Sequence, residues 1–104
     1  MNKNIEFDFG KKLKHLLVTL VKNAATPVPP HALEAARLFE AYGWDKLPLA
    51  ERRDRTRLVR AEVGPGSAVE AFFKAYPHPF TRDRYAEFLA AFNAYLDALS
   101  AEPA

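Results

Sequence analysis

The chain has 104 residues, no cysteine and a formal net charge of +2 at pH 7. Hydrophobic residues make up 49% of it and charged residues 27%, which is typical of a folded globular domain and argues against disorder. The absence of cysteine excludes disulfides, thiolate nucleophiles and thiolate metal sites. The net charge is too small to indicate any class of partner. We therefore expect residues 1–104 to form one domain.

No apolar run approaches the roughly 20 residues that span a bilayer. The N-terminus lacks the layout of a secretory signal, because the acidic Glu6 and Asp8 fall where an apolar segment should be. We expect a cytoplasmic protein that does not enter membranes.

The first residues alternate between apolar and polar, with Ile5, Phe7 and Phe9 at every second position. We expect residues 1–8 to form an extended arm that packs on the domain, with Asp8 capping the helix that follows. The alternative is an arm that pairs with the sheet edge of a partner or with a second copy of the chain.

Two helices are predicted next. The first covers residues 9–24, and its apolar face comprises Phe9, Leu13, Leu16, Leu17, Leu20, Val21 and Ala24. The prolines that follow end it. The second covers residues 30–42 and stops at Gly43, and its buried side comprises Leu33, Ala36, Leu38, Phe39 and Tyr42.

A third helix opens at residues 47–51 and is broken by residues 64–66, Gly-Pro-Gly. It contains seven polar residues in a row, so we expect it to lie on the outside of the bundle. Its thin apolar stripe is predicted to be Leu47, Ala50, Leu58 and Ala61. A fourth helix, residues 67–76, is capped by Ser67, and its core face comprises Val69, Phe72, Phe73 and Tyr76.

The clearest pattern lies in residues 81–100. Apolar side chains recur there at three- and four-residue steps, separated by alanines, which predicts a long central helix: Tyr85, Phe88, Leu89, Phe92, Tyr95, Leu96 and Leu99. Thr81 is expected to cap it, and residues 101–104 are expected to fray. The whole pattern predicts an all-α fold, a single compact bundle of about five helices with short connections that contain proline and glycine.

No group of residues points to catalysis. Ser67 and Ser100 fall at helix ends, where serine is common for capping alone, and His15, His31 and His78 are isolated from one another. We expect no catalytic, cofactor-binding or metal-binding residues, no bound cofactor and no small-molecule substrate.

Bulky rings in turns favour a protein-binding surface, since turn positions bury large rings less readily and such residues make good interface centres. The predicted surface comprises Trp44, Tyr76, His78 and Phe80. The leading hypothesis is a non-catalytic helical protein that binds a protein partner or a second copy of itself, as an accessory subunit, adaptor or inhibitor.

The alternative hypothesis is nucleic-acid binding through the basic third helix, where Arg53, Arg57 and Arg60 share one ridge. The other residues assigned to this surface are Arg52, Arg55, Lys11, Lys12 and Lys14. The same charges also fit a solvated, ion-paired surface. A third hypothesis is a small subunit that completes the active site of an enzyme, in which His78 is the residue to test first.

Overall fold

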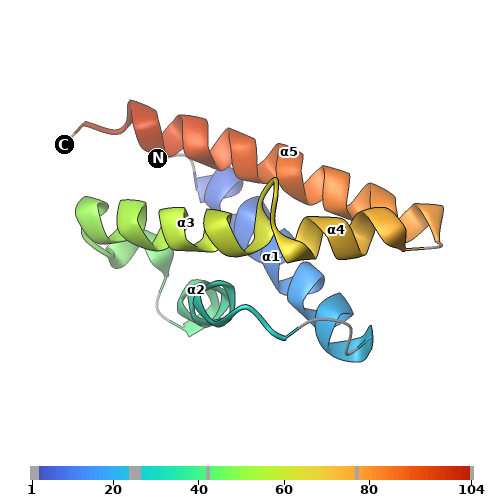
Figure 1. Cartoon of the computed structure of the whole chain (residues 1–104). Coiled ribbons are helices and arrows are strands. Elements are labelled where there is room, and N and C mark those ends of the chain that lie inside the picture. Colours follow the sequence, from blue (N-terminus) through green and yellow to red (C-terminus); the bar gives the residue numbers. More distant parts are fainter. Residues whose placement is uncertain (1–2, 24–26, 42, 77, 104) are drawn as a thin grey trace.

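The computed structural model describes residues 3–23, 27–41, 43–76 and 78–103. These residues form five α-helices and a short 3-10 helix, with no strand among them (Figure 1). The helices are α1 (Lys3–Asn23), α2 (Pro30–Ala41), α3 (Leu49–Val63), α4 (Ala68–Ala75) and α5 (Pro79–Ala101), and the 3-10 helix is η1 (Trp44–Lys46). The predicted all-α bundle is confirmed.

The helices are arranged as a closed ring. The most extensive contact joins α1 to α5, and the other main contacts join helices that follow one another in the chain. In Figure 1, α3 and α4 follow one another alongside α5, and α1 crosses behind them. The molecule is elongated, with a longest dimension of 42 Å.

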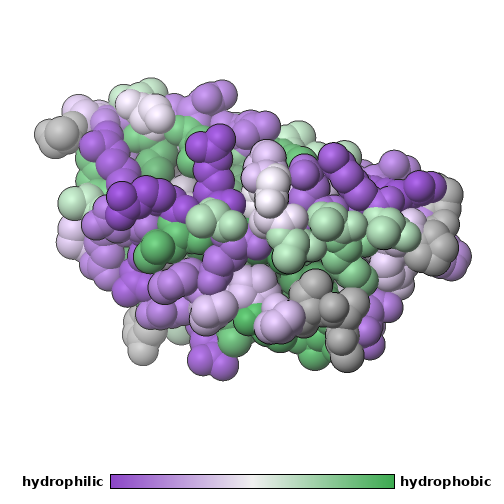
Figure 2. All heavy atoms as spheres, in the orientation of Figure 1, coloured by the Kyte–Doolittle hydropathy of each residue, from purple (hydrophilic) through white to green (hydrophobic). Residues whose placement is uncertain are grey.

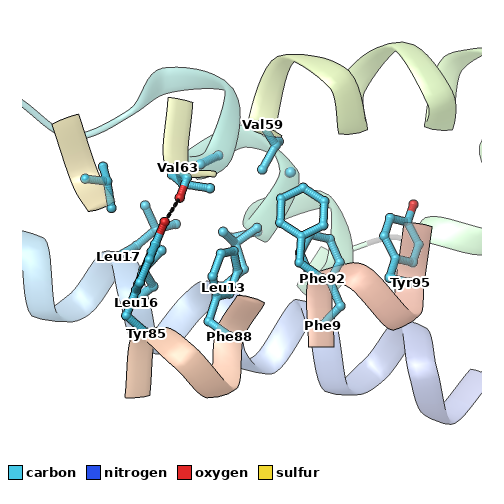
Figure 3. Close-up of a cluster of buried hydrophobic side chains, with 14 of the residues drawn as sticks. Phe9, Leu13, Leu16, Leu17, Val59, Val63, Tyr85, Phe88, Phe92 and Tyr95 are labelled. Atoms are coloured by element: carbon cyan, nitrogen blue, oxygen red, sulfur yellow. Dashed lines mark hydrogen bonds between the residues drawn. The ribbon is translucent and has the colours of Figure 1, made fainter. Parts of the chain in front are cut away.

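The aromatic stripe of α5 forms the centre of the core, as predicted. Tyr85, Phe88, Phe92 and Tyr95 are all buried. Phe9 of α1 stacks on Tyr95 with ring centroids 4.6 Å apart. In Figure 3, Phe9 and the rings of α5 form a row that faces Val59 and Val63 of α3. Each fully buried ring contributes roughly 1.5–3 kcal/mol of hydrophobic stabilisation.

The N-terminal residues are helical, so the predicted extended arm is wrong where the structure describes it. Helix α1 begins at Lys3 rather than at residue 9. A strand would place Ile5, Phe7 and Phe9 on one face, whereas a helix places Phe7 opposite the other two. The Phe9 side chain is 1% exposed and Phe7 is 70% exposed, which is the helical outcome. The burial of Phe9 and the exposure of Phe7 therefore agree with a helix that begins before residue 9.

Helix α2 approaches α1 through small residues. Its fully buried positions are Ala32, Ala35 and Ala36, whereas the larger Leu33, Leu38 and Phe39 of the predicted face are only partly buried. The ring of Phe39 lies directly on Gly10 of α1, where an added Cβ would stand 2.9 Å from the ring. This contact explains a glycine within α1, a position where glycine otherwise costs about 0.5–1 kcal/mol relative to alanine.

The predicted core face of α3 is wrong. The buried positions are Arg52, Thr56, Val59 and Val63, while Ala50, Leu58 and Ala61 are exposed and Leu47 and Leu49 are half-buried. The observed face keeps helical spacing, but two of its members are polar. They remain buried because both form hydrogen bonds inside the protein, as described below.

The helix ends give mixed outcomes. The cap at Ser67 is confirmed, since its Oγ accepts the backbone N–H of Glu70 at 3.2 Å. Thr81 is not a cap, because α5 already begins at Pro79 and His78 precedes it. Val21, predicted in the core, is 59% exposed. Predictions that involve residues 1–2, Ala24, Tyr42, Pro77 and Ala104 lie outside the described residues.

Candidate binding surfaces

Trp44 lies in the core, so it does not belong to a contact surface as predicted. It is 1% exposed, and its ring stacks on Phe39 at 4.6 Å. Its Nε1–H donates to the hydroxyl of Tyr95, which is itself bonded to Thr56 at 3.2 Å. The turn at Gly43, with φ of 79°, brings the chain back toward the core. An indole can be buried in a turn when an acceptor is supplied there.

Arg52 is also buried, and this removes it from the predicted basic ridge. Its guanidinium forms two hydrogen bonds to the carboxylate of Glu102, at 2.8 and 3.0 Å, and its Nε donates to the Leu47 carbonyl at 2.9 Å. The hydrogen bonds from Arg52 lower the pKa of the Glu102 carboxyl. The predicted frayed tail is therefore wrong at Glu102, which is anchored to α3.

A second carboxylate, Glu6 of α1, belongs to the same region. It is 7% exposed, and burial raises its pKa, with the nearby charge of Asp45 acting in the same direction and Arg52 opposing it. Sequence reasoning missed Glu6 and Glu102 because their partners are distant in the chain. The Arg52–Glu102 pair joins the start of α3 to the residue that follows α5.

Phe80 is the residue of the predicted protein-binding surface that lines a hollow. It is 67% exposed, and the guanidinium of Arg84 lies 5.1 Å from its ring centroid. The hollow has a volume of about 340 Å³ and lies between α1 and the α4–α5 end of the molecule. We call it the Phe80 groove, and it is lined by Lys12, His15, Leu16, Thr19, Phe73, Phe80, Asp83, Arg84 and Glu87.

The two other members of that predicted surface lie near the same end. Tyr76 is half-buried, and its hydroxyl donates to Asn23 Oδ1 of α1 at 2.9 Å. His78 is exposed at the start of α5. Neither lines the Phe80 groove, so of the four predicted residues Phe80 alone does so.

A second groove runs between α1 and α2 and was not foreseen from the sequence. Its volume is about 500 Å³. We call it the α1–α2 groove, and it is lined by Lys14, Leu17, Val18, Val21, Lys22, Leu33, Ala36, Arg37 and Glu40. Val18 and Val21 are 43% and 59% exposed, so apolar surface faces water here. The side chain of Ala36 is small, so it leaves a space unfilled between the two helices, and this space forms part of the groove.

The predicted arginine ridge is partly preserved. Arg53, Arg57 and Arg60 line a pocket of about 230 Å³ between α3 and α5, together with Thr56, Leu96, Leu99 and Ser100. We call it the arginine pocket. Figure 2 shows hydrophilic residues over the region of α3, whereas hydrophobic residues gather along α4.

The remaining basic residues of the predicted nucleic-acid surface are mostly engaged elsewhere. Arg55 forms ion pairs with Glu34 and Glu51, each at 3.0 Å. Lys12 pairs with Asp8 at 3.2 Å and lines the Phe80 groove. Lys14 pairs with Glu40 in the α1–α2 groove, and Lys11 is exposed.

The described residues contain no group of three or more His, Asp or Glu side chains placed to hold a metal ion. Over the same residues, no helix has both the length and the apolar character needed to cross a membrane. The hollows formed by the described residues include two grooves beside α1 and a basic pocket beside α5. The chain matches no protein-family model, no curated protein and no solved structure.

Proposed function

We propose that the protein is a non-catalytic binding protein that engages another protein through the Phe80 groove. The observation that carries this proposal is the exposure of Phe80, a large ring at the edge of a groove that also contains buried Phe73 and Leu16. Covering one such ring yields roughly 1.5–3 kcal/mol. A partner that covered it would gain a central apolar contact of the kind found at interface hot spots.

Two further features favour recognition at this groove. The guanidinium of Arg84 lies over the Phe80 ring in a cation–π contact, and both arginine and large rings are enriched at interface centres. Charges of both signs surround the ring, from Lys12, Asp83 and Glu87. Charges in this position act mainly on the choice of partner and on the rate of association.

The test uses two exposed phenylalanines as a matched pair. Phe80→Ala removes the groove residue, and Phe7→Ala removes a ring of similar exposure, 70% against 67%, on the N-terminal part of α1. A photo-crosslinking residue at position 78, which is exposed two residues before Phe80 and does not line the groove, identifies the proteins that are bound in lysate of the native cells. Purified candidates are then titrated against both variants.

Phe80→Ala is expected to weaken binding by at least about tenfold, corresponding to about 1.4 kcal/mol, while Phe7→Ala leaves it unchanged. Both variants should keep the helical circular dichroism of the wild type, since both rings face water. Equal binding by the two variants would remove the Phe80 groove from the interface. A crosslink only to a second copy of the chain would identify the groove as a self-association surface.

Nucleic-acid binding is the second candidate, and the observation that favours it is the convergence of Arg53, Arg57 and Arg60 on one pocket. Arginine forks bind phosphate oxygens in bidentate fashion. If each arginine neutralises one phosphate, affinity for a labelled duplex should fall with salt with a log–log slope of about −2.7. Replacing all three by glutamine should abolish that dependence. A wild-type protein that does not bind the duplex at low salt would exclude this candidate.

A further inference from the structure

The α1–α2 groove is apolar along its length and open to water. Its walls are Leu17, Val18 and Val21 of α1 and Leu33 and Ala36 of α2. Valine is disfavoured at exposed helix positions, where its branched side chain loses rotamer freedom and gains no packing. The two exposed valines stand three residues apart, so they lie on the same side of α1.

The size of the groove fits a short helical segment. On the α2 side its lining extends from Leu33 to Glu40, a distance of about 10 Å at 1.5 Å per residue. Two turns of a helix cover that length and present apolar side chains at positions i, i+4 and i+7. Amphipathic helices dock in apolar grooves in this way in other proteins.

The rim of the groove is basic. It carries Lys14, Lys22 and Arg37 against one carboxylate, Glu40, which is paired with Lys14. Within the part of the chain that the structure describes, no ion pair is formed by Lys22 or Arg37. The rim therefore has an excess of positive charge, which complements carboxylates and opposes a second copy of the same basic rim.

We propose that the α1–α2 groove binds an amphipathic helix of another protein whose apolar stripe is flanked by aspartate or glutamate. This site is separate from the Phe80 groove. The two grooves are lined by different residues of α1, with Lys12, His15, Leu16 and Thr19 on one side and Lys14, Leu17, Val18, Val21 and Lys22 on the other. Because the two sets lie on different faces of one helix, a chain that used both grooves would hold two partners together.

The probe is a fluorescein-labelled synthetic helix of about four turns, with leucine at positions i, i+4 and i+7 of its two central turns and glutamate beside the stripe. A second peptide has lysine in place of every glutamate, and a third keeps the composition but scatters the leucines around the helix. Fluorescence anisotropy measures binding of each peptide to the full chain. Backbone amide NMR shifts locate the bound peptide.

The acidic peptide is expected to bind at least about tenfold more tightly than the lysine peptide, through a few exposed charge pairs. The shifts should fall on α1 residues 14–22 and α2 residues 33–40. The double variant Val18→Gln/Val21→Gln should weaken binding by about tenfold or more, through loss of apolar contact. The double variant Lys22→Glu/Arg37→Glu should reverse the preference between the two charged peptides. These four positions are at the surface, so each variant should fold.

The matched control is Phe80→Ala, which alters the other groove and should leave peptide binding unchanged. A result showing that the Phe80 groove binds no protein would therefore leave the proposal for the α1–α2 groove unaffected. The proposal is overturned if the acidic, basic and scattered peptides bind equally, or if none binds at about 1 mM. It is also overturned if the wild-type chain forms a dimer that Val18→Gln/Val21→Gln disperses, because the groove would then belong to a second copy.

Discussion

Replacing Tyr95 by phenylalanine removes one buried oxygen, and we expect this change to destabilise the fold. Thr56 donates its hydroxyl proton to the Arg52 carbonyl at 2.7 Å, so Tyr95 donates to Thr56 and accepts from Trp44. Without the tyrosine oxygen, Thr56 keeps one partner. Trp44 Nε1–H loses the acceptor that it has among the described residues. A buried donor without an acceptor costs about 1–3 kcal/mol in free energy of unfolding.

The assay is urea denaturation followed by circular dichroism, with Trp44 fluorescence as a second probe, since it is the single tryptophan of the chain. In thermal unfolding followed by circular dichroism, a loss of about 1–3 kcal/mol should lower Tm by about 4–24 °C for a domain of this size. The indole proton should also exchange with D2O faster in Tyr95→Phe than in the wild type, because its hydrogen bond is lost.

The matched control is Tyr76→Phe, which removes the same atom at the surface, where the hydroxyl meets Asn23 at 2.9 Å. Its effect should stay within about 0.5 kcal/mol. If Tyr95→Phe were no more destabilising than Tyr76→Phe, the account of Trp44 as a tryptophan buried through its hydrogen bond would be refuted.

Three further changes test other parts of the fold. Gly10→Ala should destabilise the fold by about 1–3 kcal/mol, because the added methyl group overpacks against Phe39. Helix propensity alone would favour alanine, so a higher urea midpoint in the variant would contradict the close contact. Ser67→Ala should cost about 1 kcal/mol through loss of the α4 cap, and an unchanged midpoint would show the cap to be dispensable. Glu6→Gln should change the pH dependence of stability. Folding raises the pKa of Glu6 from 4.5, so the folded state favours the protonated carboxyl. The wild type therefore loses stability as the pH rises above 4.5 and Glu6 ionises. The stability of the glutamine variant relative to wild type should therefore increase as the pH rises above 4.5. A difference that stays constant with pH would mean that Glu6 is not desolvated.

Helix α5 could be predicted from sequence because its buried face is made of large apolar side chains at helical spacing. The face of α3 could not, because hydrophobicity alone marks Arg52 and Thr56 as surface residues. Arg52 is buried through Glu102, 50 residues away in the chain, and no local pattern carries that information. The start of α1 was misjudged because five residues are too few to separate a period of two from one of 3.6.

For the candidate sites too, features set by local sequence could be predicted, whereas features set by distant contacts could not. Phe80 was expected in a turn, and it lies in the first turn of α5 and is exposed. Trp44 was also expected in a turn, but it lies in η1 and is buried. The conformation of the backbone does not determine burial when a distant side chain, here Tyr95, supplies a hydrogen-bond acceptor. The α1–α2 groove depends on how α2 crosses α1 at Gly10 and Ala36, and neither residue indicates a groove by itself.

The ring of helices has a consequence for the speed of folding. Apart from the contact of α1 with α5, the main helix contacts join successive helices and can form over short lengths of chain. Such local contacts favour rapid folding, whereas closing the ring requires the two ends of the chain to meet. We therefore expect the kinetic barrier to lie at ring closure. Phe9→Leu, which weakens the contact of α1 with α5, should then slow refolding. Replacing Val63 by a smaller residue should mainly accelerate unfolding.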